Sequence, residues 1–166
     1  MAVRRRKIRE LGSAHTVTHV TNKLLLSFKE IIRESGLDVT KMSREWPTLE
    51  RGVAAWISSK HLEKVILEIF DASSGALVGR WDIEIMYGYV GDGTLWVDTD
   101  AIRYSIRKAG LAPSGCDYQV VVTRKPNAPA VDGWSSCQLR STDGFSRYCG
   151  GTTIGGSCLL YTSRCV

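Results

Sequence analysis

The side chains best suited to metal binding or covalent chemistry in this chain of 166 residues are its five cysteines and three histidines. His15 and His19 stand four residues apart, which places two imidazoles on one helix face, but no HExxH motif supplies the further ligands that zinc requires. The cysteines follow at irregular intervals and form no CxxC pair: Cys116, Cys137, Cys149, Cys158 and Cys165. We therefore predict no metal site and no cofactor, and reduced thiols rather than disulfides.

Two further patterns resemble a phosphate-binding loop and a catalytic acid pair, but neither meets the requirements of such a site. Residues 150–157 are rich in glycine like a phosphate-binding loop, but Gly156 stands where that loop needs a lysine, and no helical pattern follows. Asp82 and Glu84 lie two apart on the polar side of a predicted strand, which a solvated sheet face explains more simply than an acid pair. We predict that the protein is not an enzyme.

Charge is concentrated at the start of the chain. The net charge is +5, and the first ten residues include the basic run Arg4, Arg5, Arg6 and Lys7, which we assign to a flexible arm of residues 1–13. No stretch of about 18 apolar residues exists, so we expect no transmembrane helix. The arm is not followed by the apolar segment of a signal peptide, so we expect a cytoplasmic protein.

Apolar residues recur at helical spacing in the first third of the chain. A helix is predicted from Thr16, with Gly36 as its C-cap. Its apolar stripe is Val17, Val20, Leu24, Phe28 and Ile31. A second helix is predicted to begin at Ser43 or at 46–47, with proline near its first position, and to end near Ser58.

The following residues alternate as strands do. Strands are predicted at 61–70, 77–87 and 118–123, the last apolar enough to be central, with a helix at 98–109 and a short strand near 136–140. In the second strand Trp81, Ile83, Ile85 and Tyr87 face the core, and Arg80, Asp82, Glu84 and Met86 face the other way. This order predicts an α+β domain with a mainly antiparallel sheet.

Several ordered motifs resemble the HORMA domain, and most closely the bacterial HORMA proteins of antiphage defence operons. The motifs are the opening helix 16–28, the strand 78–85, the strand 118–123, Gly133-Trp134, the Gln138-Leu-Arg-Ser141 segment, and the stretches 91–106 and 151–155. The resemblance covers residues 14–157 and implies three helices on a mainly antiparallel sheet, closed by a C-terminal safety belt. It implies a HORMA core at 14–125 and a belt at 126–157.

The resemblance also implies a function for the weakly patterned belt. HORMA domains capture an extended closure peptide under the belt, where the peptide adds a strand to the sheet. The bacterial members are implied to activate a cGAS-like nucleotidyltransferase and to be reopened by an AAA+ ATPase, for which Arg4, Arg5, Arg6 and Lys7 would form a handle. The candidate peptide-binding residues are Val120, Val122, Trp134, Leu139, Arg140 and Phe145.

The last nine residues depart from the family pattern. A final apolar belt strand with aromatic residues is expected there, but residues 158–166 read CLLYTSRCV, which resembles a translated adapter tail. We hypothesise that this tail is not native, in which case the belt would lack its last strand.

Two functions of other classes remain as alternatives. The basic arm could make the chain a small nucleic-acid-binding protein, although aromatic residues are not interleaved with its charges. A cysteine hydrolase would require Cys116, Cys137 or Cys149 to meet one of the histidines.

Overall fold

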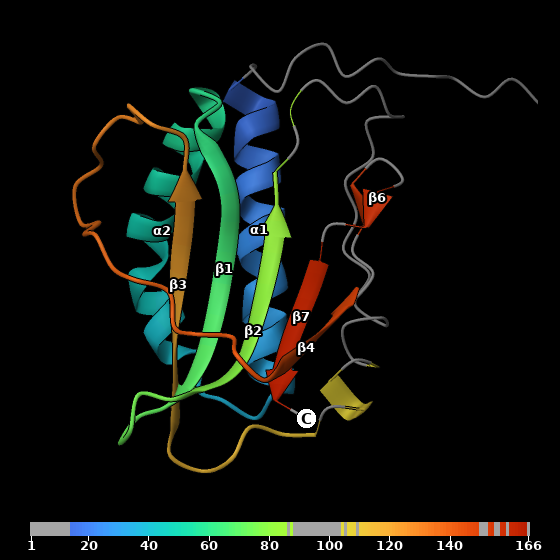
Figure 1. The fold of residues 1–166 in the computed structure, drawn as a ribbon. Helices are drawn as coiled ribbons and strands as arrows, with labels where there is room; N and C mark the ends of the chain where they lie inside the picture. The colour runs from blue at the N-terminus through green and yellow to red at the C-terminus, as the bar shows by residue number, and fades with distance from the viewer. Residues whose placement is uncertain are drawn as a thin grey trace, which may run out of the picture.

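The chain folds into a sheet that carries helices on one face. The computed structural model describes residues 14–85, 87, 104, 106–108, 110–149, 153–154, 157–158 and 160–165. Its helices are α1 (Ala14–Glu34) and α2 (Thr40–Ser58). The five-stranded sheet has the order β3-β1-β2-β7-β4, formed by β3 (Cys116–Arg124), β1 (Leu62–Asp71), β2 (Leu77–Glu84), β7 (Leu160–Cys165) and β4 (Phe145–Cys149). Both helices lie behind this sheet in Figure 1.

All described strand pairs are antiparallel, which confirms the predicted α+β class. A separate two-stranded sheet joins β5 (Thr153–Ile154) to β6 (Ser157–Cys158). No described helix is long and apolar enough to cross a membrane.

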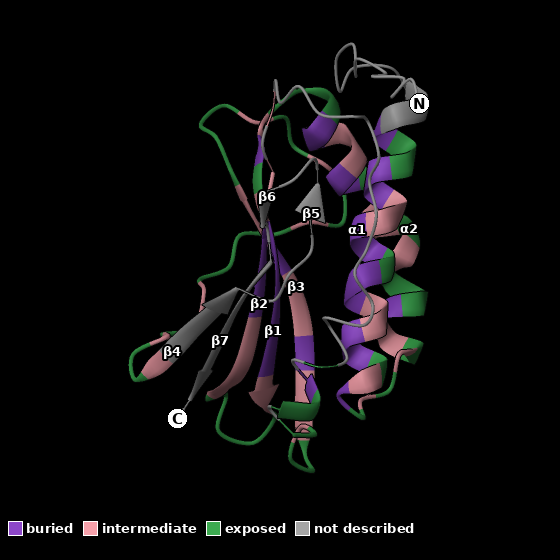
Figure 2. Ribbon diagram, turned by 90° about the vertical axis from the view of Figure 1, so that its right-hand side faces the viewer, coloured by how far each residue is buried: buried purple, intermediate pink, exposed green. Residues whose placement is uncertain are grey.

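Helix α1 follows the predicted pattern and begins two residues before the predicted start. Its whole apolar stripe is buried, and Leu25 and Ile32 widen it (Figure 2). At the C-terminus Gly36 adopts φ +81°, its amide donates to the Arg33 carbonyl, and the Leu37 amide donates to the Ile32 carbonyl. This is the Schellman arrangement, in which a glycine without Cβ strain ends the helix.

Helix α2 begins earlier than predicted. It starts at Thr40, and Pro47 lies inside it. The Asp38 carboxylate accepts a hydrogen bond from the Thr40 amide (2.9 Å), and the Tyr118 hydroxyl accepts one from the Met42 amide (3.0 Å). These bonds satisfy amides that the first turn of a helix leaves unpaired, so a partner on β3 extends the helix beyond its local signal.

Strand β3 was predicted to be central and is instead one of the two edge strands of the sheet. Tyr118, Val120 and Val122 pack toward the helices, whereas Val121 is buried on the opposite face. The strand is apolar because both of its faces are covered: the helices lie behind it, and the chain that follows it crosses in front (Figure 1).

Strand β2 ends at Glu84, three residues before the predicted end at Tyr87. Trp81 and Ile83 are buried as predicted. The opposite face is not simply solvated, because Asp82 is buried and accepts two hydrogen bonds from Arg80, at 2.7 and 2.8 Å. The bond to Asp82 raises the pKa of the Arg80 guanidinium. The predicted solvated face is therefore wrong for Asp82.

The third helix is described only in part. Tyr104 and residues 106–108 are helical, and Ile106 is buried as its predicted stripe requires. The rest of the predicted helix 98–109 and the arm of residues 1–13 lie outside the described residues.

The strand predicted at 136–140 does not form, and sequence reasoning missed β4 and β7. Residues 160–165 form β7, which lies between β2 and β4, so the tail supplies a strand in this structure. Whether residues 158–166 are native stays a hypothesis.

The turn between β1 and β2 yields a prediction about acid stability. Asp71 accepts hydrogen bonds from the Ser73 hydroxyl (2.6 Å) and the Ser74 amide (2.8 Å), and these bonds lower the pKa of Asp71 to about 2. The folded pKa is depressed, so this stabilisation is complete above the ordinary pKa, about 4, and is lost as the pH falls to about 2. Asp71→Asn should lower the urea midpoint at neutral pH, and the difference from wild type should disappear near pH 2.

Ser73→Ala serves as the matched variant because it keeps the carboxylate and removes the bond with the largest effect on its pKa. Its midpoint should fall between those of wild type and Asp71→Asn. An Asp71→Asn difference of equal size at both pH values would contradict the assignment.

Candidate functional site

The outer edge of β3 is one of the two edges of the five-stranded sheet, and β4 forms the other. No described strand pairs with that edge, because β3 is the terminal member of the strand order. The β3–β4 connection, residues 125–144, leaves the end of β3, runs along the outer side of α2 and then crosses the front of the sheet to reach β4 (Figure 1). An unpaired strand edge presents free backbone donors and acceptors to any extended chain that lies beside it.

Trp134 attaches the first half of this connection to α2. Its ring meets the Trp56 ring edge to face, with centroids 5.0 Å apart and planes at 77°. Its indole N–H donates to the Thr48 carbonyl at 3.0 Å. The approach depends on Gly52, because a Cβ at that position would overlap the indole. We call this group of contacts the Trp134 anchor.

Further contacts hold the same half of the connection against α2. The Trp56 indole N–H donates to the Pro129 carbonyl at 2.7 Å, and the Arg51 guanidinium donates to the Asp132 carbonyl at 2.9 Å. The Arg124 guanidinium lies 4.5 Å from the centroid of the Trp56 ring, within the range of a cation–π interaction. Residues 129–134 are thus fixed on the helical side of the sheet.

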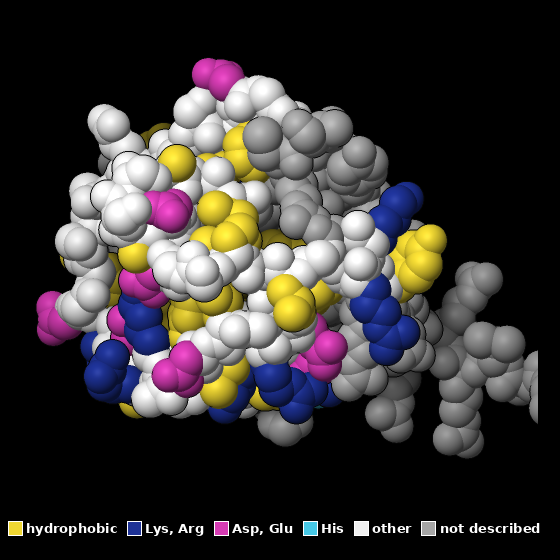
Figure 3. All heavy atoms as spheres, turned by 90° about the horizontal axis from the view of Figure 1, so that it is seen from below, with side chains coloured by type: hydrophobic (Ala, Val, Ile, Leu, Met, Phe, Trp, Pro, Cys, Tyr) yellow, Lys and Arg dark blue, Asp and Glu magenta, His cyan; other side chains and the backbone are white. Residues whose placement is uncertain are grey.

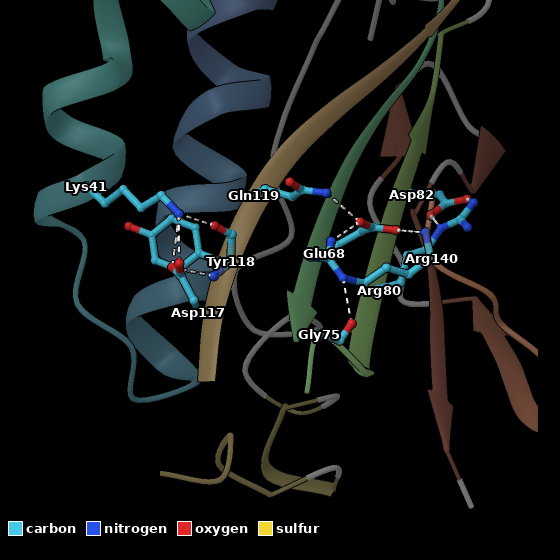
Figure 4. Close-up of polar contacts among 9 residues, drawn as sticks. All are labelled: Lys41, Glu68, Gly75, Arg80, Asp82, Asp117, Tyr118, Gln119 and Arg140. Carbon is cyan, nitrogen blue, oxygen red and sulfur yellow. Dashed lines mark hydrogen bonds and ion pairs between the residues drawn. The ribbon is translucent and has the colours of Figure 1, made fainter. Parts of the chain in front are cut away.

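Arg140 attaches the second half to the opposite face of the sheet, as Figure 4 shows. Its guanidinium Nη1 donates to Glu68 Oε2 at 2.8 Å, and its backbone amide donates to Glu68 Oε1 at 2.9 Å. The guanidinium also lies 3.6 Å from the centroid of the Phe70 ring and donates to the Gly75 carbonyl at 2.9 Å. We call this group of contacts the Arg140 anchor.

Glu68 is the buried partner in the Arg140 anchor. Its side chain has no solvent exposure, whereas that of Arg140 is about one quarter exposed (24%). Gln119 on β3 donates a third hydrogen bond to the carboxylate at 2.8 Å. A buried charge that loses its partner destabilises a fold by roughly 3–5 kcal/mol. This carboxylate therefore favours the conformation in which the connection covers the sheet.

The two anchors lie on opposite sides of the sheet, so the chain between them passes around the β3 edge. Residues 135–138 are exposed, and Leu139 is half-buried. Six residue steps separate Trp134 from Arg140, and a fully extended chain covers about 20 Å in that distance. Neighbouring strands lie about 4.8 Å apart. The chain between the anchors is thus long enough to span several strand spacings at the β3 edge.

The structure brings some of the predicted site residues together. Trp134 and Arg140 form the two anchors, and half-buried Leu139 adjoins Arg140. Val120 and Val122 lie in the edge strand and pack toward the core, and half-buried Phe145 begins β4. The side chains of Arg4, Arg5, Arg6 and Lys7 lie outside the described residues.

Sequence reasoning missed Glu68, Trp56 and Gly52. The sequence did contain a signal for Glu68, because this residue interrupts the apolar run Val65–Phe70 and both residues next to it in the sequence are apolar. A carboxylate at such a position requires a buried partner, and Arg140 was already a candidate residue. Gly52 offered a weaker signal as a glycine within an amphipathic helix, where close packing is a common reason for it.

Cys116, one of the candidate cysteine nucleophiles, is not activated in the structure. Cys116 is half-buried, and desolvation raises the pKa of its thiol, whereas an activated cysteine needs a lowered value. Cys137 is exposed and free. The described residues contain no group of three or more metal-ligating side chains.

Comparison of the sequence with models of known protein families shows which family this fold represents. The chain matches the model of Bacterial HORMA domain 2 over residues 6–164. It therefore belongs to the bacterial HORMA family, as its motifs suggested. A comparison with curated proteins finds no match.

Solved structures share the fold at low sequence identity. C. elegans HTP-2 bound to the HIM-3 closure motif has a TM-score of 0.68 at 8% identity, with 93% of this chain and 92% of that chain covered. A chain of the Mitotic Checkpoint Complex has a TM-score of 0.58 at 13% identity, with coverage of 92% and 95%. The E. coli MS115-1 CdnC:HORMA-deltaN complex gives 0.49 at 12% identity, with coverage of 90% and 87%.

The close approach of Gly52 to Trp134 leads to a prediction. Alanine normally stabilises a helix over glycine by up to ~1 kcal/mol, but here its Cβ meets the indole, so Gly52→Ala should destabilise the protein by about 1–3 kcal/mol. Urea unfolding measures this free energy.

The matched background is Trp134→Ala, which removes the indole. Gly52→Ala should be stabilising there, so the two substitutions should be strongly coupled in a double-mutant cycle. Equal effects of Gly52→Ala in both backgrounds would contradict the packing described.

Proposed function

We propose that this protein is a noncatalytic peptide-binding switch that captures an extended closure peptide between the β3 edge and the β3–β4 connection. The observation that carries the proposal is the path of the connection around an unpaired strand edge, with an anchor on each side of the sheet. A peptide that adds a strand gains backbone hydrogen bonds from β3 and is enclosed by the connection.

The rigid position of β3 supports this mode of binding. Lys41 on α2 donates to the Asp117 carboxylate at 3.0 Å and to the Tyr118 carbonyl at 2.7 Å (Figure 4). The Tyr118 hydroxyl donates to the Asp38 carbonyl at 2.7 Å. An edge strand that is already ordered loses little conformational entropy on binding a peptide. In a structural relative, HTP-2, a HORMA fold is bound to a closure motif.

We further propose that the peptide-bound protein activates a cGAS-like nucleotidyltransferase in antiphage defence and that an AAA+ ATPase reopens it. Membership of the bacterial HORMA family supports this assignment, together with the motif resemblance to defence-operon proteins. The basic residues Arg4, Arg5, Arg6 and Lys7 are the proposed handle for the ATPase.

Trp134→Ala tests the peptide site. The probe is a peptide selected against the wild-type chain from a displayed library of random sequences. Because the substitution frees the connection from α2, peptide affinity should fall by about tenfold or more, in line with the loss of a buried aromatic anchor. Fluorescence anisotropy measures the Kd, and limited proteolysis should show residues 126–157 better protected when the peptide is bound than when it is absent.

Trp46→Ala is the matched control, since this tryptophan is half-buried like Trp134 but belongs to α2 and makes its cation–π contact with Lys29 of α1. This substitution should alter the stability of the protein without lowering its affinity for the peptide. An equal loss of affinity in both variants, or no protection of residues 126–157, would count against the proposal.

Deletion of residues 2–9 separates peptide binding from nucleic-acid binding. The deletion removes the basic run, so any electrostatic binding to DNA or RNA should collapse, whereas peptide affinity should stay within about twofold. On the face shown in Figure 3, acidic and basic side chains are interspersed, so that face offers no large area of one sign. Peptide binding that vanishes with the arm would contradict the proposed site.

A further inference from the structure

We propose that the Glu68–Arg140 pair sets the size of the opening around the β3 edge, so that release of this one pair admits a peptide while the Trp134 anchor stays in place. The inference rests on the proposed peptide-binding function. It concerns how the same site is loaded.

The two halves of the connection are held very differently. Residues 129–134 contact α2 through two backbone carbonyls and the Trp134 side chain. Among the described residues 135–144, every hydrogen bond to the sheet and to the β1–β2 turn comes from Arg140. The second half can therefore lift from the sheet when a single residue is released.

The release of Arg140 changes the length of chain around the edge. With the anchor engaged, the chain from Trp134 to Arg140 reaches about 20 Å, or several strand spacings. With it released, the next fixed point is Phe145 at the start of β4, and the chain from Trp134 reaches about 37 Å. A peptide end with side chains can enter the larger opening while β4 and β7 remain in the sheet.

The environment of the pair suits an intermittent contact. Glu68 is fully buried and Arg140 is partly exposed, so water reaches the guanidinium first. Arg80, the residue opposite Glu68 on β2, is already bonded to Asp82. Gln119 alone would remain on the carboxylate after release. Glu68 therefore draws Arg140 back whenever it leaves.

Hydrogen exchange followed by mass spectrometry tests the release without any peptide. Glu68→Gln keeps the shape of the side chain, but its amide nitrogen meets a donor in either orientation: the Arg140 amide at the Oε1 position, or Gln119 and the Arg140 guanidinium at the Oε2 position. In residues 135–144 the backbone amide bonded to the sheet is that of Arg140, and its exchange should accelerate by about tenfold or more. Exchange in residues 126–134, where the Trp134 amide bonds to the Val131 carbonyl, should stay within about twofold. Arg140→Gln changes only the connection and should have the same effect. It provides an independent test if Glu68→Gln does not fold.

Lys64→Gln is the matched control, because it disrupts another ion pair between β1 and β2, that of Lys64 with Glu84, and leaves Arg80 and the connection untouched. It should not accelerate exchange in residues 135–144. The proposal is overturned if residues 126–134 and 135–144 accelerate together, or if neither range responds to Glu68→Gln or to Arg140→Gln.

Stopped-flow binding of the library-selected peptide tests the consequence for loading. Association and dissociation rate constants should both rise by about tenfold in Glu68→Gln, with a much smaller change in Kd, since the pair forms in both free and bound protein. Unchanged rate constants with intact peptide binding would contradict the proposal that the Glu68–Arg140 pair sets the size of the opening. A complete absence of peptide binding in wild type would instead contradict the proposed function, and the exchange result distinguishes the two failures.

Discussion

Glu68 is a carboxylate without solvent exposure on the sheet face turned away from the helices, and this position constrains the whole C-terminal third. A buried charge is tolerated only with a charged or strongly hydrogen-bonding partner. Its neighbour on β2, Arg80, is occupied by Asp82, and Gln119 on β3 supplies only a neutral donor. The remaining positive charge comes from Arg140, so the chain after β3 must return across the sheet at this point.

This constraint combines with a firmly held edge strand. At its start, β3 is bonded to α2 through Lys41 and Tyr118, and just past its end the Lys125 amide donates to the His61 carbonyl at 2.8 Å. The strand is thus fixed along its length, while its outer backbone edge stays free of described strands. A firmly held edge strand beneath a segment held by few contacts separates the ordered part of the proposed site from the part proposed to move.

The sequence predicts those elements whose signals are local. The stripe of α1 and the alternation of Trp81 and Ile83 are set by nearby residues, and both were identified correctly. The start of α2 and the edge position of β3 were not, because they depend on Tyr118 and on a covering chain distant in sequence. Trp134 and Arg140 were proposed from their motifs, whereas Glu68 was overlooked although it interrupts an apolar run, because its partner lies 72 residues further along the chain.

The two anchors differ in chemistry, and this difference bears on how they respond to conditions. The Trp134 anchor joins two indole rings and a neutral hydrogen bond, so its strength comes mainly from apolar contact and close packing. The Arg140 anchor joins opposite charges, one fully buried, and is poorly screened by salt while the carboxylate stays covered. Once Arg140 lifts, water solvates both groups and the attraction between them falls steeply. The charged contact is therefore the more nearly two-state of the two anchors: it is either formed in a dry environment or lost in a wet one. This behaviour fits the proposed release of the second half of the connection.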